Sequence, residues 1–90
     1  MPSYAIASFR SRQQVFGFES ALKRAGLRAE VVSTPREVAL GCGLSVRFAS
    51  EDWPRVSEIY RRVRPGNLIG FYQVEARPGA RPRLTPMQAP

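Results

Sequence analysis

The chain has 90 residues, a formal net charge of +7, one cysteine and no histidine. This length suits one small domain and excludes larger architectures such as a TIM barrel or a full dinucleotide-binding domain. Without histidine, Ser-His-Asp and Cys-His catalytic sites are excluded, and one cysteine supports neither a Cys/His zinc site nor an internal disulfide. The sequence thus indicates no metal or cofactor site and favours a reduced, cytoplasmic setting.

The basic residues number 14 against 7 acidic ones, and thirteen of the 14 are arginines. Such an excess is typical either of a solvated surface or of a protein with an anionic partner. Three of the positive charges, Arg77, Arg81 and Arg83, lie close to the end of the chain. Because the rest of the chain then carries a net charge of only +4 (7 minus 3), the pattern argues against nucleic acid as that partner. No apolar run approaches the ~18 residues of a membrane span, and residues 1–9 lack the basic start of a signal peptide.

The first half of the chain predicts a strand, a helix and a second strand. Residues 4–9 are mostly apolar and predict a buried strand. A helix is expected from Ser11 to about Ala25, because apolar residues recur at three- and four-residue steps and a glycine follows. Ser11 is its expected N-cap, with Gln14 as the capping-box partner. Residues 28–32 predict the second strand.

The second half repeats this order before it ends in a polar segment. Residues 44–48 alternate apolar and polar side chains and predict a strand. A second helix is expected to begin at Ser50 or Asp52, and residues 68–75 predict the last strand. Residues 76–90 contain four prolines and predict an extended, mobile tail. The second helix is expected to bury one stripe, formed by Trp53, Val56, Ile59, Tyr60 and Val63.

This order, βαββαβ, favours an α+β fold. With right-handed crossovers it gives a ferredoxin-like sandwich, in which two helices cover one face of a four-stranded antiparallel sheet. We therefore expect a single domain over residues 1–75 and a disordered tail over residues 76–90.

The cysteine lies in a context that packing does not explain. Cys42 stands between Gly41 and Gly43, directly before the strand at residues 44–48. Flanking glycines leave a thiol little cover and allow backbone amides to approach the sulfur. Such amides, or a nearby Arg36 or Arg47, would lower the pKa of the thiol from its ordinary ~8.5. The alternative is a small turn residue without a role.

The segment before the cysteine carries a family resemblance. Residues 34–37, Thr-Pro-Arg-Glu, are followed by Cys42-Gly43 and a strand, which resembles the small bacterial domains described as putative selenium/sulfur carrier proteins. The resemblance extends in element order over about residues 4–75. It implies that Cys42 holds sulfur or selenium as a persulfide or perselenide. In the family small polar residues precede the cysteine, whereas residues 38–41 here are Val-Ala-Leu-Gly.

The carrier interpretation assigns a role to each residue around Cys42. Cys42 is the sulfur-bearing thiolate, Gly41 and Gly43 present turn amides, and Arg36 stabilises the negative charge. Glu37 either pairs with Arg36 or raises the pKa of the thiol by repulsion, although both residues also suit a helical cap and a surface ion pair. The expected partners are a donor such as a cysteine desulfurase and an unidentified acceptor.

Two non-catalytic alternatives remain open. The sheet face without helices is a possible binding surface for RNA or another partner, with Tyr4 and Phe48 as candidate stacking residues. Alternatively, the domain forms a regulatory homodimer, because Ile69, Phe71 and Tyr72 place bulky groups on both faces of the last strand. The homodimer is also compatible with the carrier interpretation.

Overall fold

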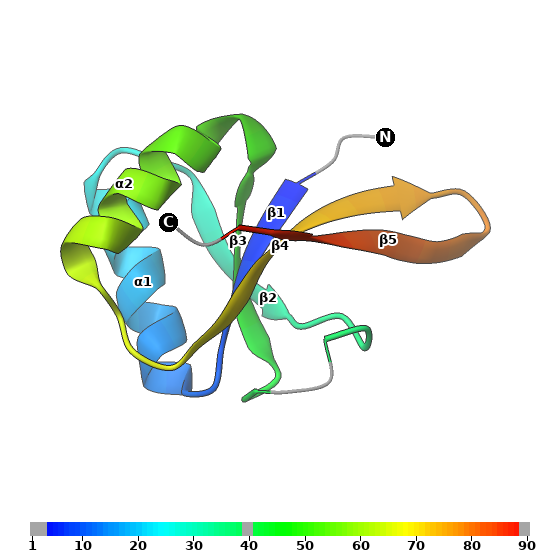
Figure 1. Ribbon diagram of the computed structural model, residues 1–90, viewed down its shortest axis with the longest axis horizontal. Coiled ribbons are helices and arrows are strands. Elements are labelled where there is room, and N and C mark those ends of the chain that lie inside the picture. Colours follow the sequence, from blue (N-terminus) through cyan, green and yellow to red (C-terminus); the bar gives the residue numbers. More distant parts are fainter. Residues whose placement is uncertain (1–3, 39–40, 89–90) are drawn as a thin grey trace.

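The computed structural model describes residues 4–38 and 41–88, and these form two α-helices and one five-stranded antiparallel sheet (Figure 1). Predicted features at residues 1–3, 39–40 and 89–90 lie outside the described residues. The strand order is β2-β3-β1-β4-β5. In chain order the elements are β1 (Tyr4–Phe9), α1 (Arg12–Arg24), β2 (Ala29–Ser33), β3 (Leu44–Ala49), the 3-10 turn η1 (Ser50–Asp52), α2 (Trp53–Val63), β4 (Leu68–Arg77) and β5 (Ala80–Met87).

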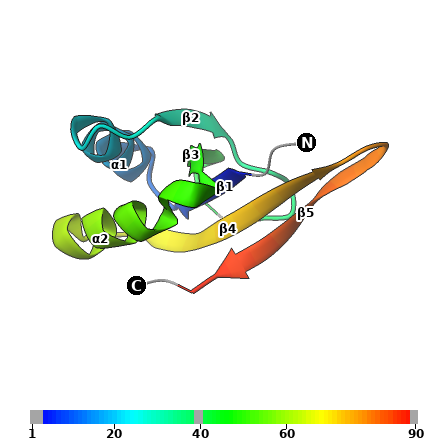
Figure 2. The same cartoon turned by 90° about the horizontal axis from the view of Figure 1, so that it is seen from above.

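Both helices pack on the same face of the sheet, as the sequence predicts. Alternate residues of β1, β3 and β4 point towards the helices and meet their apolar stripes, forming one buried cluster. Figures 1 and 2 show α1 and α2 side by side, with the β4–β5 hairpin extending away from them. The buried cluster consists of Ala5, Ala7, Phe9, Val15, Phe18, Leu22, Val46, Phe48, Val56, Ile59 and Phe71.

Phe71 on β4 is the centre of the aromatic packing. Its ring lies 4.8 Å from Trp53 and 5.3 Å from Tyr60 of α2. It also lies 6.3 Å from Phe18 of α1 and 6.4 Å from Phe48 of β3, measured between ring centroids. All four arrangements are edge-to-face, the geometry that aromatic quadrupoles favour. One side chain therefore connects both helices with the sheet.

The predicted elements from residue 4 to residue 75 are found with boundaries shifted by one or two residues, but two details are wrong. Ser11 is the N-cap residue of α1, yet its side chain makes no capping bond and only its carbonyl accepts from Gln14 and Val15. Val63 is 49% exposed instead of buried. It is the last residue of α2, where the chain turns away at Arg64 in a left-handed conformation.

The prediction of four strands and a disordered tail is wrong for residues 80–87. These residues form β5, which pairs with β4 from Phe71↔Met87 to Arg77↔Ala80. Along a strand, alternate N–H groups point to the same side, so Pro82 and Pro86 can both direct their missing donors to the outer edge. Proline content alone therefore did not exclude an edge strand.

The sheet face opposite the helices is also covered in part. Ile6, Ser8 and Val74, which point to this face, are at most 1% exposed. Phe48 instead belongs to the core on the helix side, so Tyr4 and Phe48 do not form the shared stacking surface that the RNA interpretation needs. No helix in the described part of the chain is long and apolar enough to cross a membrane.

We predict that Phe71→Ala lowers the free energy of unfolding by about 3–5 kcal/mol, because it removes a buried ring that four other aromatic side chains contact. Phe16→Ala is the matched control, because Phe16 is 46% exposed and its loss leaves no enclosed cavity. Urea unfolding followed by tryptophan fluorescence measures both variants. Equal losses of stability in the two variants would contradict the central role of Phe71.

Candidate functional site

Cys42 lies at the end of the sheet where β1 ends and β3 and β4 begin. Its backbone N–H donates to the carbonyl oxygen of Phe9, the last residue of β1, with an N···O distance of 3.3 Å. On the other side, the carbonyl of Gly43 accepts from the N–H of Thr34 at 2.9 Å. The cysteine is partly exposed and packs against the rim of the core. The sheet thus fixes the backbone of this turn, and the cysteine stays partly exposed.

The two glycines beside the cysteine have different physical roles. Both adopt positive φ, 107° at Gly41 and 86° at Gly43. At Gly41 a Cβ atom would lie 2.5 Å from Cδ1 of Ile69 and 2.7 Å from the carbonyl oxygen of Phe9. At Gly43 a Cβ atom would meet nothing within 4 Å. Gly41 therefore permits a close approach to β1, whereas Gly43 supplies only the conformation.

The sulfur makes one weak polar contact. Sγ of Cys42 lies 3.8 Å from the carbonyl oxygen of Leu44, in the position of an S–H donor. The described residues provide no hydrogen bond from a backbone amide to this sulfur, so the expected amide contacts from the Gly-Cys-Gly turn are not seen. The sulfur of Cys42 therefore lies beside a carbonyl oxygen.

The two candidate arginines lie in different environments. Arg36 is exposed, and within residues 4–38 and 41–88 no hydrogen bond or ion pair joins it to Cys42, so its role stays a prediction. Arg47 is engaged elsewhere: its guanidinium lies 4.1 Å from the centre of the Tyr4 ring and 3.7 Å from Oε1 of Glu30.

Glu37 binds neither of its expected partners. Both oxygens of its carboxylate accept hydrogen bonds from Arg81 of β5, at 2.5 Å from Nε and 3.0 Å from the second nitrogen. These bonds are the main reason why the pKa of Glu37 falls from 4.5 to about 2, and the nearby Arg36 charge adds a smaller contribution. Arg81 lies in the predicted tail, so local spacing gave no signal for this pair.

A chain of three hydroxyl groups, which the sequence did not predict, supports the site. Oγ of Ser45 lies 2.8 Å from Oγ of Ser8 and 2.7 Å from Oγ1 of Thr34. Ser8 and Ser45 are buried and opposite each other in the β1–β3 register. Their mutual hydrogen bond satisfies two groups that would otherwise be costly to bury. Two serines at buried strand positions were the available signal, but only the register brings them together.

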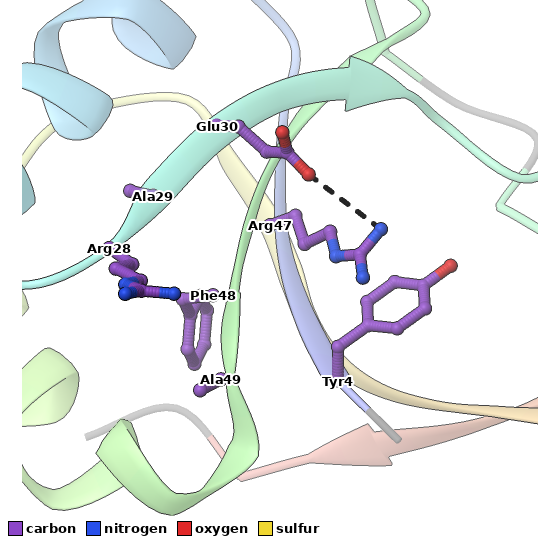
Figure 3. Close-up of a pocket in the computed structure, with 7 residues that line it drawn as sticks. All are labelled: Tyr4, Arg28, Ala29, Glu30, Arg47, Phe48 and Ala49. Carbon is purple, nitrogen blue, oxygen red and sulfur yellow. Dashed lines mark ion pairs between the residues drawn. The ribbon is translucent and has the colours of Figure 1, made fainter. Parts of the chain in front are cut away.

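Cys42 lines neither of two cavities that lie at the other end of the sheet. One cavity, with a volume of about 420 Å³, lies at the opposite end of β3 (Figure 3). Figure 3 shows Arg47 directed between Tyr4 and Glu30 on one side of it. The cavity is lined by Tyr4, Arg28, Ala29, Glu30, Arg47, Phe48 and Ala49. The glycine turn that bears Cys42 is therefore separate from this cavity.

A small α+β domain with one partly exposed cysteine in a glycine turn is the class of protein that fold and site define. The model of the family described as "Putative Se/S carrier protein-like" matches residues 4–64, and the chain belongs to this family. The resemblance inferred from the sequence is thus confirmed. The match spans β1 to α2 and includes Cys42, while β4 and β5 lie beyond it. Neither the search of curated proteins nor that of solved structures found a match.

We predict that Gly41→Ala costs more stability than Gly43→Ala. The first variant adds both a positive-φ penalty and a clash with Phe9 and Ile69, which together should exceed about 2 kcal/mol. The second adds only the conformational penalty, roughly 1 kcal/mol. Thermal and urea unfolding measure both losses. If Gly43→Ala proves equally or more destabilising, the close approach of Gly41 to β1 does not restrict that position.

We predict that the carboxyl group of Glu37 titrates with a pKa of about 2, as followed by NMR of its side-chain carbon. Because this pKa is below the ordinary 4.5, the pair stabilises the fold above pH 4.5 and loses that contribution as pH falls towards 2. In Arg81→Gln the pKa should return towards 4.5. An unchanged pKa in that variant would show that Arg81 is not the cause.

Proposed function

We propose that this protein carries sulfur or selenium on Cys42, as a persulfide or perselenide. The observation that carries the proposal is the position of the cysteine: partly exposed, in a turn fixed to the end of β1, and inside the segment that matches the carrier family. Because the sequence has no second cysteine, no internal thiol can displace the bound sulfur as hydrogen sulfide. A loaded protein would therefore persist until an acceptor arrives.

The transfer needs no cofactor and no external oxidant. The Cys42 thiolate attacks the outer sulfur of a donor persulfide, R–S–SH, and the S–S bond of the donor breaks. The donor leaves as R–S⁻, and Cys42 becomes Cys–S–SH. The proton lost by the Cys42 thiol passes to R–S⁻ or to water. An acceptor nucleophile then removes the outer sulfur in the same way and regenerates the Cys42 thiolate.

The surroundings of Cys42 are compatible with a neutral thiol and with a thiolate or persulfide anion. The contact of Sγ with the Leu44 carbonyl is long and weak, so losing it on deprotonation sacrifices little. The carboxylate of Glu37 is bound by Arg81. The neighbouring Arg36, which is exposed, therefore lacks its expected carboxylate partner. We assign Arg36 the role of stabilising the thiolate or persulfide anion on Cys42.

We also infer that the first four strands form a ferredoxin-like sandwich to which β5 is added. The supporting observations are the βαββαβ element order and the antiparallel arrangement β2-β3-β1-β4. The proposed homodimer has lost its sequence-based support, because Phe71 is buried in the core, Ile69 lies against Gly41 and the Tyr72 ring covers Gly70. The homodimer itself stays a prediction.

We predict that the reduced protein gains the mass of one sulfur atom when it is incubated with inorganic polysulfide, or with a bacterial cysteine desulfurase and free cysteine. Intact-mass spectrometry under non-reducing conditions measures the gain, and peptide mapping after alkylation should place it on Cys42. Dithiothreitol should remove the added sulfur. Cys42→Ser is the matched control and should gain nothing.

The proposal fails if the wild-type protein gains no sulfur from either donor, or if the Cys42→Ser variant gains as much. Arg36→Gln tests the assigned role of Arg36 separately. In that variant the rate of Cys42 alkylation by iodoacetamide near neutral pH should fall, because less thiolate is present. A rate equal to that of the wild type would remove Arg36 from the site.

A further inference from the structure

The end of the molecule that bears Cys42 is also the end where exposed arginines gather. Two backbone hydrogen bonds define this end: Cys42 N–H to the Phe9 carbonyl, and Arg10 N–H to the Asn67 carbonyl at 2.8 Å. The start of α1 and the loop that follows α2 meet at this end of the sheet (Figure 1). We call its five exposed cations the arginine end: Arg10, Arg12, Arg61, Arg62 and Arg64.

The charges of the arginine end are not neutralised within the described part of the chain. None of the ion pairs among the described residues involves an arginine of the arginine end. These ion pairs engage other cations, namely Lys23, Arg47, Arg55 and Arg81. Several carboxylates, including Glu30, Glu51 and Asp52, lie towards the opposite end of β3, where β2 begins and α2 starts. The molecule is therefore electrically asymmetric, with its positive end beside Cys42.

Arg64 occupies a position that favours glycine. It ends α2 in the left-handed conformation, with φ 50° and ψ 57°, and its N–H donates to the Tyr60 carbonyl at 2.8 Å. Glycine adopts this conformation without the steric cost that a Cβ atom brings. The Arg64 side chain is exposed and makes no ion pair or hydrogen bond with the described residues. A long cation is thus kept at a strained position where it adds no described contact to the fold.

Two exposed apolar side chains accompany these arginines. Phe16 is 46% exposed and Val63 is 49% exposed, and they are the exposed large hydrophobic residues of the described chain. Phe16 follows Arg12 by one helical turn, and Val63 stands between Arg62 and Arg64. Aromatic residues and arginine are enriched at protein–protein interfaces. Exposed aliphatic groups contribute little to phosphate-backbone recognition, so this combination favours a protein over a nucleic acid.

We propose that the arginine end, together with Phe16 and Val63, is the docking surface for an acidic sulfur-donor protein that delivers its persulfide to Cys42. The inference rests on the proposed function of Cys42. The unpaired positive charges attract and orient a partner with an acidic rim, and the exposed apolar groups on the two helices supply desolvated contact. This placement lets binding and sulfur transfer occur at the same end of the chain.

The test compares two variants that lose the same charge. The docking variant is Arg61→Gln/Arg62→Gln/Arg64→Gln, and the control is Arg24→Gln/Arg28→Gln/Arg83→Gln, whose arginines lie outside the arginine end. With a bacterial cysteine desulfurase and cysteine at low salt, the docking variant should accept sulfur about tenfold more slowly than the control. Wild-type transfer should slow as salt rises. Final loading by excess polysulfide and alkylation by neutral iodoacetamide should be the same in all three proteins.

A single substitution separates docking from folding. Arg64→Gly should raise the melting temperature, because it relieves the left-handed strain, and should still slow transfer from the desulfurase.

Equal transfer rates in the docking and control variants overturn the inference. Loading by polysulfide without any transfer from the desulfurase also overturns it, and leaves Cys42 as a carrier. No loading by either donor overturns the proposed function itself. Arginine-end binding to a single-stranded RNA, with transfer unaffected, assigns the surface to nucleic acid instead.

Discussion

The close approach of the glycine turn to the end of β1 is the constraint on which the site depends. The Phe9 carbonyl accepts from Cys42 N–H, and Gly41 passes so near to it that a Cβ atom has no room. Phe9 itself is fully buried among the core aromatics. The rigid core therefore positions the backbone of the turn, and the thiol gains a defined location without being enclosed.

The elements up to residue 75 could be predicted because their signals are local. Alternation, helical periodicity and the glycine after α1 each depend on neighbouring residues, and the helices and four strands follow from them. The fifth strand could not be predicted in this way. Its prolines suit an edge only because β4 is already present to supply the partner strand, and that pairing is a property of the folded chain.

The same distinction separates the parts of the site. Cys42 and its glycines were identified from three consecutive residues, and they lie within the segment that the family model matches. The predicted partner of Glu37 was wrong because its actual partner, Arg81, lies 44 positions away. The Ser8–Ser45 pair was missed because it spans 37 positions. The serine contact depends on the β1–β3 register, and the Glu37–Arg81 contact depends on the β4–β5 hairpin reaching the segment after β2. Neither the register nor the reach of the hairpin has a local sequence signature.

The prolines of β5 have a consequence for how this chain behaves among copies of itself. A sheet edge with free donors and acceptors can pair with the edge of another molecule, which is a common route to aggregation. Pro82 and Pro86 remove two of those donors, and their rings obstruct an approaching strand. An edge of this kind resists indiscriminate strand pairing. The residues that suggested disorder in the sequence thus make the outer edge of the folded sheet a poor template for a further strand.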